Sequence, residues 1–156
     1  MEQKRKNRIL VPVDFSRHSE NALLLACRLA QCFKATPLVL HVVHDPGEMP
    51  GYYSRPLKKK HLARIEDGAA DMMAEFLTRI TTEHKSLKDL PALDSLLVKG
   101  LPTTRILEVA AQEQAAMIVM GSKGRTGLKH LLLGSVAEHV VQLSPIPVTV
   151  AKAKGK

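Results

Sequence analysis

The sequence predicts a single α/β domain: a doubly wound, five-stranded parallel sheet with helices on both faces, a Rossmann-like architecture. Five short apolar segments alternate with four longer segments of helical periodicity, in the order βαβαβαβαβ. The strand segments are largely apolar, as expected for strands that are covered on both faces. Right-handed crossovers between such strands place helices on both sides of the sheet. The length of 156 residues suits one domain with a full hydrophobic core, so we expect residues 1–156 to form a single unit.

The composition is that of an ordinary globular domain, with 45% hydrophobic and 24% charged residues. No apolar run approaches the roughly 18 residues that a membrane span requires. The basic N-terminus leads directly into the first strand, without the apolar region of a signal peptide. We therefore expect a cytoplasmic protein that does not associate with membranes.

The formal charge of +8 is concentrated at the two ends of the chain. Residues 1–8 carry +3, and Lys152, Lys154 and Lys156 carry another +3, so about +2 is left for the folded body. We expect segments 1–7 and 152–156 to be basic, flexible tails that favour solubility rather than a binding surface. The chain has no Trp and only five other aromatic residues, too few for platforms that stack bases. These observations argue against a nucleic-acid-binding protein.

The cysteines and histidines do not form a metal-binding pattern. Cys27 and Cys32 are five residues apart on a predicted helix, which favours buried, reduced thiols. The seven His residues show no H-E-x-x-H spacing, and their single H-x-x-H pair, His41 and His44, spans the end of a predicted strand and the start of the loop after it. We therefore expect no metal site built only from protein ligands.

The first strand is predicted at Ile9–Val13, with Pro12 at its end because proline cannot donate a hydrogen bond to a neighbouring strand. Asp14-Phe15-Ser16 then forms a loop. Ser16 is the expected N-cap of the first helix, and Ser19 or Glu20 supplies the answering group in the first turn. This helix extends to about Phe33. Its predicted apolar face comprises Ala22, Ala26, Leu29, Ala30 and Phe33.

The second strand is predicted at Leu38–Val43. Residues 44–56 contain three Pro and two Gly, which predicts a long loop of the kind that is often functional. The second helix is expected from about Leu57 to Lys85, with Gly68 as a weak point. Its predicted apolar stripe comprises Leu62, Ile65, Ala69, Met72, Met73, Phe76 and Ile80.

The third strand, Asp94–Lys99, is less apolar, which suits a sheet edge. Pro102 suits the first position of the third helix, whose Ile106, Leu107 and Ala110 face inward. The remaining elements are a fourth strand at Met117–Met120, a short turn at 131–133, a fourth helix from Ser135 to just before Pro145, and a fifth strand at Ile146–Val150.

The chemistry of the chain is concentrated after the fourth strand. Gly121, Gly124 and Gly127 follow a buried apolar run, and Gly134-Ser135 opens the next helix. Glycines between a strand and a helix start let backbone N–H groups approach an anion, and the helix terminus adds a positive dipole end. In doubly wound sheets, ligands bind beyond the carboxyl ends of the strands, where the strand order reverses. If the first and fourth strands are neighbours, the 14–16 loop and the 121–127 loop line one crevice.

Three common nucleotide or hydrolase motifs are absent from the sequence. No G-x-G-x-x-G follows the first strand, no G-x-x-x-x-G-K-[ST] occurs, and there is no G-x-S-x-G elbow. What remains is a phosphate cradle after the fourth strand and a carboxylate, Asp14, after the first.

Together, Val11-Pro12-Val13-Asp14-Phe15-Ser16, Leu40-His41-Val42-Val43, the glycine pattern of Gly121–Ser135 and Pro145-Ile146-Pro147-Val148 resemble the universal stress protein family. The resemblance covers essentially the whole chain, and the glycine pattern is similar to that of the family's ATP-binding subgroup. It implies the strand order 3-2-1-4-5, which makes the first and fourth strands neighbours. It also implies a homodimer paired through the fifth strand, Pro147–Ala151.

The resemblance further implies a binding site for ATP, or for ADP or AMP. Pro12, Val13 and Asp14 would lie beside the ribose and adenine, Val42 would meet the adenine through its backbone, and Met120 would pack near the nucleoside. The phosphates would be held by the loop Gly121, Ser122, Lys123, Gly124 and Arg125, and by Gly134, Ser135 and Val136 at the helix start. Mg²⁺ or Mn²⁺ would be carried by the phosphates. Lys123 stands where many similar proteins have His, so a His-specific role does not transfer.

Structural explanations exist for the same residues. Ser135 and Glu138 spell a capping box, and Asp14 is a possible cap of the first helix. Lys123 and Arg125 are also typical solvated loop charges, and His41 suits a hydrogen-bonded strand position.

The leading functional hypothesis is a nucleotide-dependent regulator of the stress response that acts on an unidentified protein partner. A slow ATPase or phosphotransferase and a nucleotide-free dimeric scaffold are the alternatives. Binding is favoured over catalysis because the only candidate general base, Asp14, is expected beside the nucleoside.

Overall fold

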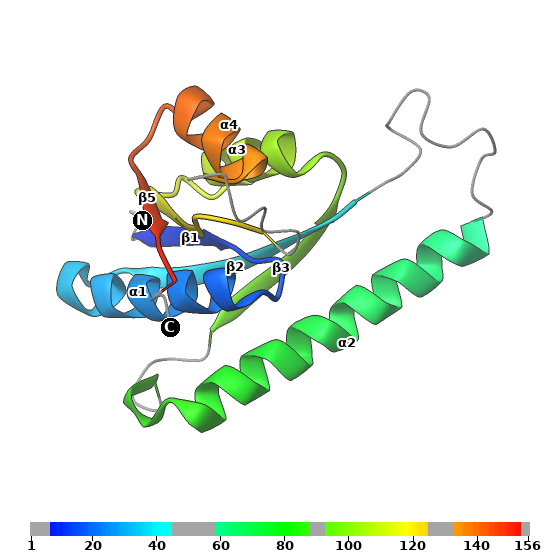
Figure 1. The fold of residues 1–156 in the computed structure, drawn as a ribbon, viewed down its shortest axis with the longest axis horizontal. Coiled ribbons are helices and arrows are strands. Elements are labelled where there is room, and N and C mark those ends of the chain that lie inside the picture. The colour runs from blue at the N-terminus through cyan, green and yellow to red at the C-terminus, as the bar shows by residue number, and fades with distance from the viewer. Residues whose placement is uncertain (1–6, 45–58, 88–92, 125–132, 154–156) are drawn as a thin grey trace, which may run out of the picture.

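A computed structural model of the chain describes residues 7–44, 59–87, 93–124 and 133–153. Five parallel strands form one sheet in the order β3-β2-β1-β4-β5, which confirms the expected doubly wound α/β fold (Figure 1). Along the chain the elements are β1 (Arg8–Pro12), α1 (Arg17–Phe33), β2 (Thr36–Val43), α2 (Lys59–Glu83), the 3₁₀ turn η2 (Lys85–Leu87), β3 (Asp94–Lys99), α3 (Pro102–Gln112), β4 (Met117–Gly121), α4 (Ser135–Leu143) and β5 (Val148–Ala151).

The sheet is covered on both faces. Helices α1 and α2 lie on one face, and α3 and α4 lie on the other (Figure 1). Alternate strand residues therefore enter two separate cores, as the pleat of a strand requires. Ile9, Val11 and Val39 belong to the core under α1 and α2, whereas Leu10 and Leu40 belong to the core under α3 and α4. The carboxyl ends of β1 and β4 emerge side by side, because Ile9 pairs with Met117 and Leu10 with Ile118.

Helix α1 begins as the sequence predicts. The Ser16 hydroxyl accepts a hydrogen bond from the Ser19 amide, and Lys34 closes the helix in the left-handed conformation at φ 49°. The alanines at 22, 26 and 30 are buried as expected. Phe33, the last residue of the helix, is however 57% exposed instead of buried. Cys27 is buried but Cys32 is exposed, so the expectation of two buried thiols is wrong for Cys32.

Helix α2 packs through its C-terminal half, where Ala69, Met73, Phe76 and Ile80 are buried. Its N-terminal half extends past the sheet (Figure 1), which explains why Ile65 is 41% exposed instead of buried. The helix continues through Gly68 and ends at Glu83, two residues before the predicted end. The predicted start at Leu57, the side chain of Leu62 and most of the 44–56 loop lie outside the described residues.

The C-terminal half follows the predicted order. β3 is an edge strand, as its lower apolar content indicates, and Pro102 is the first residue of α3. β5 begins two residues later than predicted, at Val148. The Ser144 hydroxyl donates to the Ile146 carbonyl (2.8 Å) and accepts from the Ile146 amide (3.2 Å), so a local turn delays the strand. In the described part of the chain, no helix is long and apolar enough to cross a membrane.

Candidate functional site

The loop after β1 is built around Asp14. Its Oδ1 accepts hydrogen bonds from the Ser16 amide (3.1 Å) and the Ser19 hydroxyl (3.0 Å). The Ser19 oxygen in turn lies 3.3 Å from the amide of Asp14, which donates to it. Because Ser16 is the N-cap of α1, the alternative in which Asp14 serves only as that cap is wrong. The hydrogen bonds instead hold the Asp14 carboxylate in one orientation at the end of β1.

Phe15 adopts a left-handed backbone conformation, at φ 65°, which is uncommon for a bulky residue. Its ring packs 4.3 Å from the His41 ring and 5.5 Å from Phe76 of α2. His41 Nδ1 donates to the Val13 carbonyl (2.8 Å); Nδ1 is the protonated nitrogen because a carbonyl only accepts. The expected hydrogen-bonded strand histidine is thus confirmed. Beside this packed Phe15, the Asp14 carboxylate faces Gly124 in the loop after β4.

Gly121 and Gly124 have different structural reasons to be glycine. A Cβ at Gly121 would lie 2.8 Å from the backbone of His18, so Gly121 permits the close approach of α1 to β4. A Cβ at Gly124 would lie 3.0 Å from Asp14 Oδ2. The loops after β1 and β4 therefore meet at Gly124 and Asp14, which confirms that they line one crevice. Arg125 lies outside the described residues.

The start of α4 differs from the predicted capping box. The Gly134 amide donates to the Ser122 carbonyl (2.7 Å), and Gly134 is the N-cap, with no side-chain cap hydrogen bond. Ser135 is therefore the first residue inside the helix and not its cap, so the capping-box explanation is wrong. The amides of the first helical turn have no partner within an α-helix, and they carry the positive end of its dipole.

These elements enclose a cavity of about 360 Å³, a size typical of small-molecule sites. One wall is apolar, formed by Leu40, Val42, Pro102, Ile106 and Met120. Asp14, Lys123, Gly124 and the start of α4 also line the cavity and lie together, because Gly124 approaches Asp14 and Gly134 approaches both Lys123 and Gly124. The cavity lies where the direction of strand order reverses, between β1 and β4.

Most of the predicted residues meet at this cavity. It is lined by Pro12, Val13, Asp14, Val42, Met120, Gly121, Lys123, Gly124, Gly134, Ser135 and Val136. Ser122 is only 4% exposed and does not line it; its carbonyl holds Gly134 instead.

Sequence reasoning did not assign Ser19, Leu40, Pro102, Ile106 and Ala137 to the site, and it favoured a structural role over a site role for His41, although all six line the cavity. The site role of Ser19 could have been predicted, because Ser19 lies three residues after the N-cap Ser16. A side chain at that position points back to the loop before the helix.

Solved structures of similar shape support the fold. Universal stress protein UspA from Lactobacillus plantarum matches with a TM-score of 0.75 at 28% identity, covering 96% of this chain and 99% of that one. A universal stress protein in complex with cAMP matches with a TM-score of 0.66 at 19% identity, covering 95% of this chain and 98% of that one. The universal stress protein from Archaeoglobus fulgidus in complex with dAMP matches with a TM-score of 0.59 at 21% identity, covering 93% of this chain and 97% of that one. At these identities their likeness concerns the fold alone.

Sequence comparison identifies relatives of the same length. A universal stress protein of Thermus aquaticus is 33% identical over 144 residues, which cover 92% of this chain and 97% of the relative. Universal stress protein MJ0577 of Methanocaldococcus jannaschii is 31% identical over 163 residues, which cover 94% of this chain and 95% of the relative. The model of the universal stress protein family matches residues 6–152. With its fold, its glycine pattern and these relatives in agreement, the chain belongs to the universal stress protein family.

Proposed function

We propose that this protein binds ATP in the cavity between β1 and β4 and acts as a nucleotide-dependent regulator of the stress response in the cytoplasm. One observation carries the proposal: a single cavity combines an apolar wall with a glycine-lined end at the start of a helix. The apolar wall suits a flat aromatic base, and the glycine-lined end suits a chain of phosphates. A nucleotide carries both groups in one small molecule, so one cavity can hold it.

The apolar wall is suited to the adenine base. Val42 and Met120 come from β2 and β4, the strands on either side of β1, and Pro102 and Ile106 come from α3. Burial of a base between such side chains is favourable because apolar surface leaves water. Asp14 stands at the boundary of this wall, with its carboxylate oriented by Ser16 and Ser19. A fixed carboxylate there suits the hydroxyl groups of a ribose, which are hydrogen-bond donors.

The other end is suited to phosphates. The amides at the start of α4 lack a side-chain cap, and a phosphate oxygen is a natural acceptor for them. Gly124 and Gly134 leave the main chain accessible, and Lys123 adds a positive charge to the same end. Arg125, the remaining predicted phosphate contact, is retained in the proposal on the resemblance alone.

A divalent cation, Mg²⁺ or Mn²⁺, fits this arrangement only as a companion of the phosphates. Among the described residues that line the cavity, Asp14 supplies the one carboxylate, and it already accepts two hydrogen bonds. Mg²⁺ is commonly held by substrate phosphates with one or two carboxylates, and it would neutralise phosphate charge here. The same scarcity of carboxylates favours binding over hydrolysis, because the one carboxylate among the described residues of the cavity, Asp14, is assigned to the ribose.

A homodimer through β5 belongs to the same proposal. Among the described residues, β5 pairs with β4 alone and ends the sheet on that side, so its outer edge is available to the backbone of a second copy. Val141 and Leu143 are 45% and 63% exposed, and they belong to α4, the helix that directly precedes β5 in the chain. These side chains add exposed apolar surface to this part of the protein. Sedimentation at micromolar concentration tests this part: a monomer would contradict it.

Calorimetric titration of the full chain with ATP, ADP and AMP in the presence of Mg²⁺ tests the binding proposal. Saturable heat with ATP is expected, and its complete absence with all three nucleotides would refute the proposal. Mass spectrometry of the ligand after long incubation then separates a regulator, which leaves ATP intact, from a slow ATPase, which converts it to ADP or AMP.

A further inference from the structure

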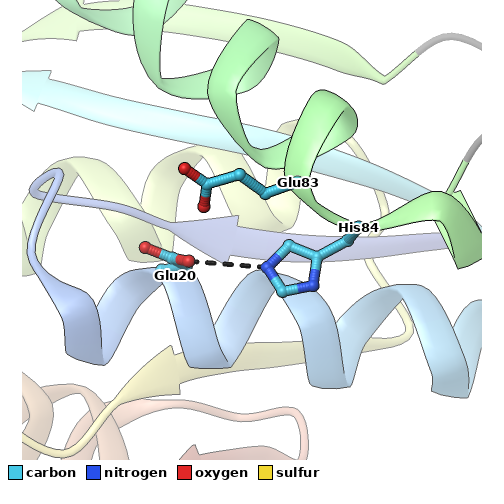
Figure 2. A group of neighbouring side chains, drawn as sticks. All are labelled: Glu20, Glu83 and His84. Atoms are coloured by element: carbon cyan, nitrogen blue, oxygen red, sulfur yellow. Dashed lines mark ion pairs between the residues drawn. The ribbon is translucent and has the colours of Figure 1, made fainter.

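A second group of chemically active side chains lies between α1 and the end of α2, away from the cavity. It consists of Glu20, Glu83 and His84, named here the α1–α2 cluster (Figure 2). One ligand atom from each residue lies within 4.8 Å of the other two. Glu20 comes from the first turn of α1, Glu83 is the last residue of α2, and His84 follows it. The fold thus brings together one nitrogen and two carboxylate ligands that are distant in the sequence.

The backbone around the cluster is fixed. The His84 amide donates to the Ile80 carbonyl, and the His84 carbonyl accepts from the Leu87 amide, both at 3.0 Å. Ile80 and Leu87 are buried, so the segment that carries His84 is anchored on each side. The Glu20 amide donates to the Ser16 carbonyl within the capped start of α1. Ligands on anchored backbone lose little conformational freedom when an ion binds.

The geometry within the cluster is close to that of a metal site. His84 Nε2 and Glu20 Oε1 are 3.6 Å apart, beyond hydrogen-bonding distance. Zinc bonds of about 2.0–2.2 Å to nitrogen and oxygen place two ligand atoms of a tetrahedral site about 3.3 Å apart. A small closure of this pair is therefore sufficient, and the Glu83 ligand atom lies within 4.8 Å of both. Glu20 and His84 also line an open hollow, which provides an entry path for an ion.

Arg79 is the competing cation. Its Nη1 lies 3.0 Å from Glu20 Oε2 and 3.4 Å from Glu83 Oε2, so it bridges the two carboxylates. The hydrogen bond with Glu20 raises the pKa of Arg79, which keeps the guanidinium charged. An ion that binds the cluster must displace this bridge. Positive side chains that line the same hollow, Arg17, Arg28 and Lys152, also oppose a cation.

We propose that the α1–α2 cluster binds a zinc ion through Glu20, Glu83 and His84, with Arg79 as the counter-ion that the zinc displaces. Imidazole nitrogen combined with carboxylate oxygen selects zinc over Mg²⁺ and Ca²⁺, which take oxygen ligands. The site is separate from the proposed nucleotide cavity, since none of its three residues lines that cavity.

The test is calorimetric titration of the full chain with ZnCl₂ in a non-chelating buffer, without nucleotide. The variant His84→Gln is expected to bind zinc at least tenfold more weakly, because even outer-shell changes cost zinc sites 10–100-fold in affinity. Glu20→Gln should weaken zinc similarly, whereas Arg79→Met should strengthen it by removing the competitor. His139→Gln, on the exposed surface of α4, is the matched control and should bind like the original protein.

Thermal unfolding provides a second measurement. Zinc should raise the melting temperature of the original protein and of His139→Gln but not of His84→Gln, with each variant checked by circular dichroism. Zinc that binds His84→Gln and Glu20→Gln as tightly as the original protein would overturn the proposal, since the ion would then occupy other ligands. Weaker zinc binding by a folded Arg79→Met variant would also contradict it, because displacement of Arg79 predicts the opposite sign.

Discussion

Replacement of Gly124 by Val is the sharpest test of where the phosphates bind. A Cβ at this position would lie 3.0 Å from Asp14 Oδ2, so that the carboxylate must move by a few tenths of an ångström to reach ordinary contact. The carboxylate is not free to move without cost, because Oδ1 accepts hydrogen bonds from Ser16 and Ser19. The two further methyl carbons of Val would extend into the crevice between the loops.

The size of the effect follows from these contacts. Hydrogen bonds to a charged group contribute about 1.5–3 kcal/mol each. Loss of one such bond between the main chain of this loop and a phosphate oxygen therefore corresponds to a loss of roughly 10- to 150-fold in affinity. We expect Gly124→Val to bind ATP at least tenfold more weakly. The domain should still fold, because Gly124 is exposed and its φ is not positive, so Val is compatible with the backbone there.

The assay is calorimetric titration with ATP and Mg²⁺, accompanied by thermal unfolding followed by circular dichroism. Gly68→Ala is the matched glycine control, since a Cβ at Gly68 meets nothing within 4 Å. It should leave ATP affinity unchanged. A folded Gly124→Val variant with the original ATP affinity would refute the assignment of this loop to the phosphates.

Four further results are expected. Gly121→Ala should lower the melting temperature even without nucleotide, because its Cβ would meet the His18 backbone at 2.8 Å; an unchanged melting temperature would contradict this packing. Gly68→Ala should stabilise the exposed helix by about 0.8–1 kcal/mol, measured by urea unfolding, and a destabilised variant would show that the glycine has a role the structure does not reveal. At pH 8 a thiol reagent should label one cysteine per native chain, Cys32, because Cys27 is buried and burial raises its pKa to about 11; rapid labelling of both would be inconsistent with the core. Ser19→Ala should weaken ATP binding severalfold by releasing the Asp14 carboxylate, and in an Asp14→Asn background, which has lost that charge, the effect of Ser19→Ala should largely disappear; full additivity in the double variant would argue against a positioning role.

Local signals account for much of what the sequence predicts correctly. Ser16 was identifiable as an N-cap and Pro102 as a first helical residue, because capping and the missing proline N–H act within one turn. Apolar runs located all five strands, with bounds wrong by one or two residues where turn chemistry intervened, as at Ser144 before β5. The neighbouring positions of β1 and β4 followed from the family resemblance and are confirmed by the sheet.

Exposure at the ends of elements was not predictable from periodicity. Phe33 and Ile65 both lie on apolar stripes of the sequence, yet both are exposed. Periodicity states which side of a helix a residue occupies, but only the tertiary structure decides whether anything covers that side. Phe33 is the last residue of α1, and Ile65 belongs to the N-terminal half of α2.

The sequence by itself determined the fold class and placed Asp14 and Gly124 at the correct ends of their strands, because glycine spacing, capping residues and strand ends are local properties. The family resemblance supplied the apolar part of the predicted cavity lining, including Val42 and Met120. The tertiary structure decided what each of these residues touches. In the structure, Gly121 permits the close approach of α1 to β4, and Gly134, not Ser135, is the N-cap of α4. Glu20 of α1 lies beside His84, which follows α2. Such contacts depend on the packing of segments that are distant in the chain, and no local pattern contains that information.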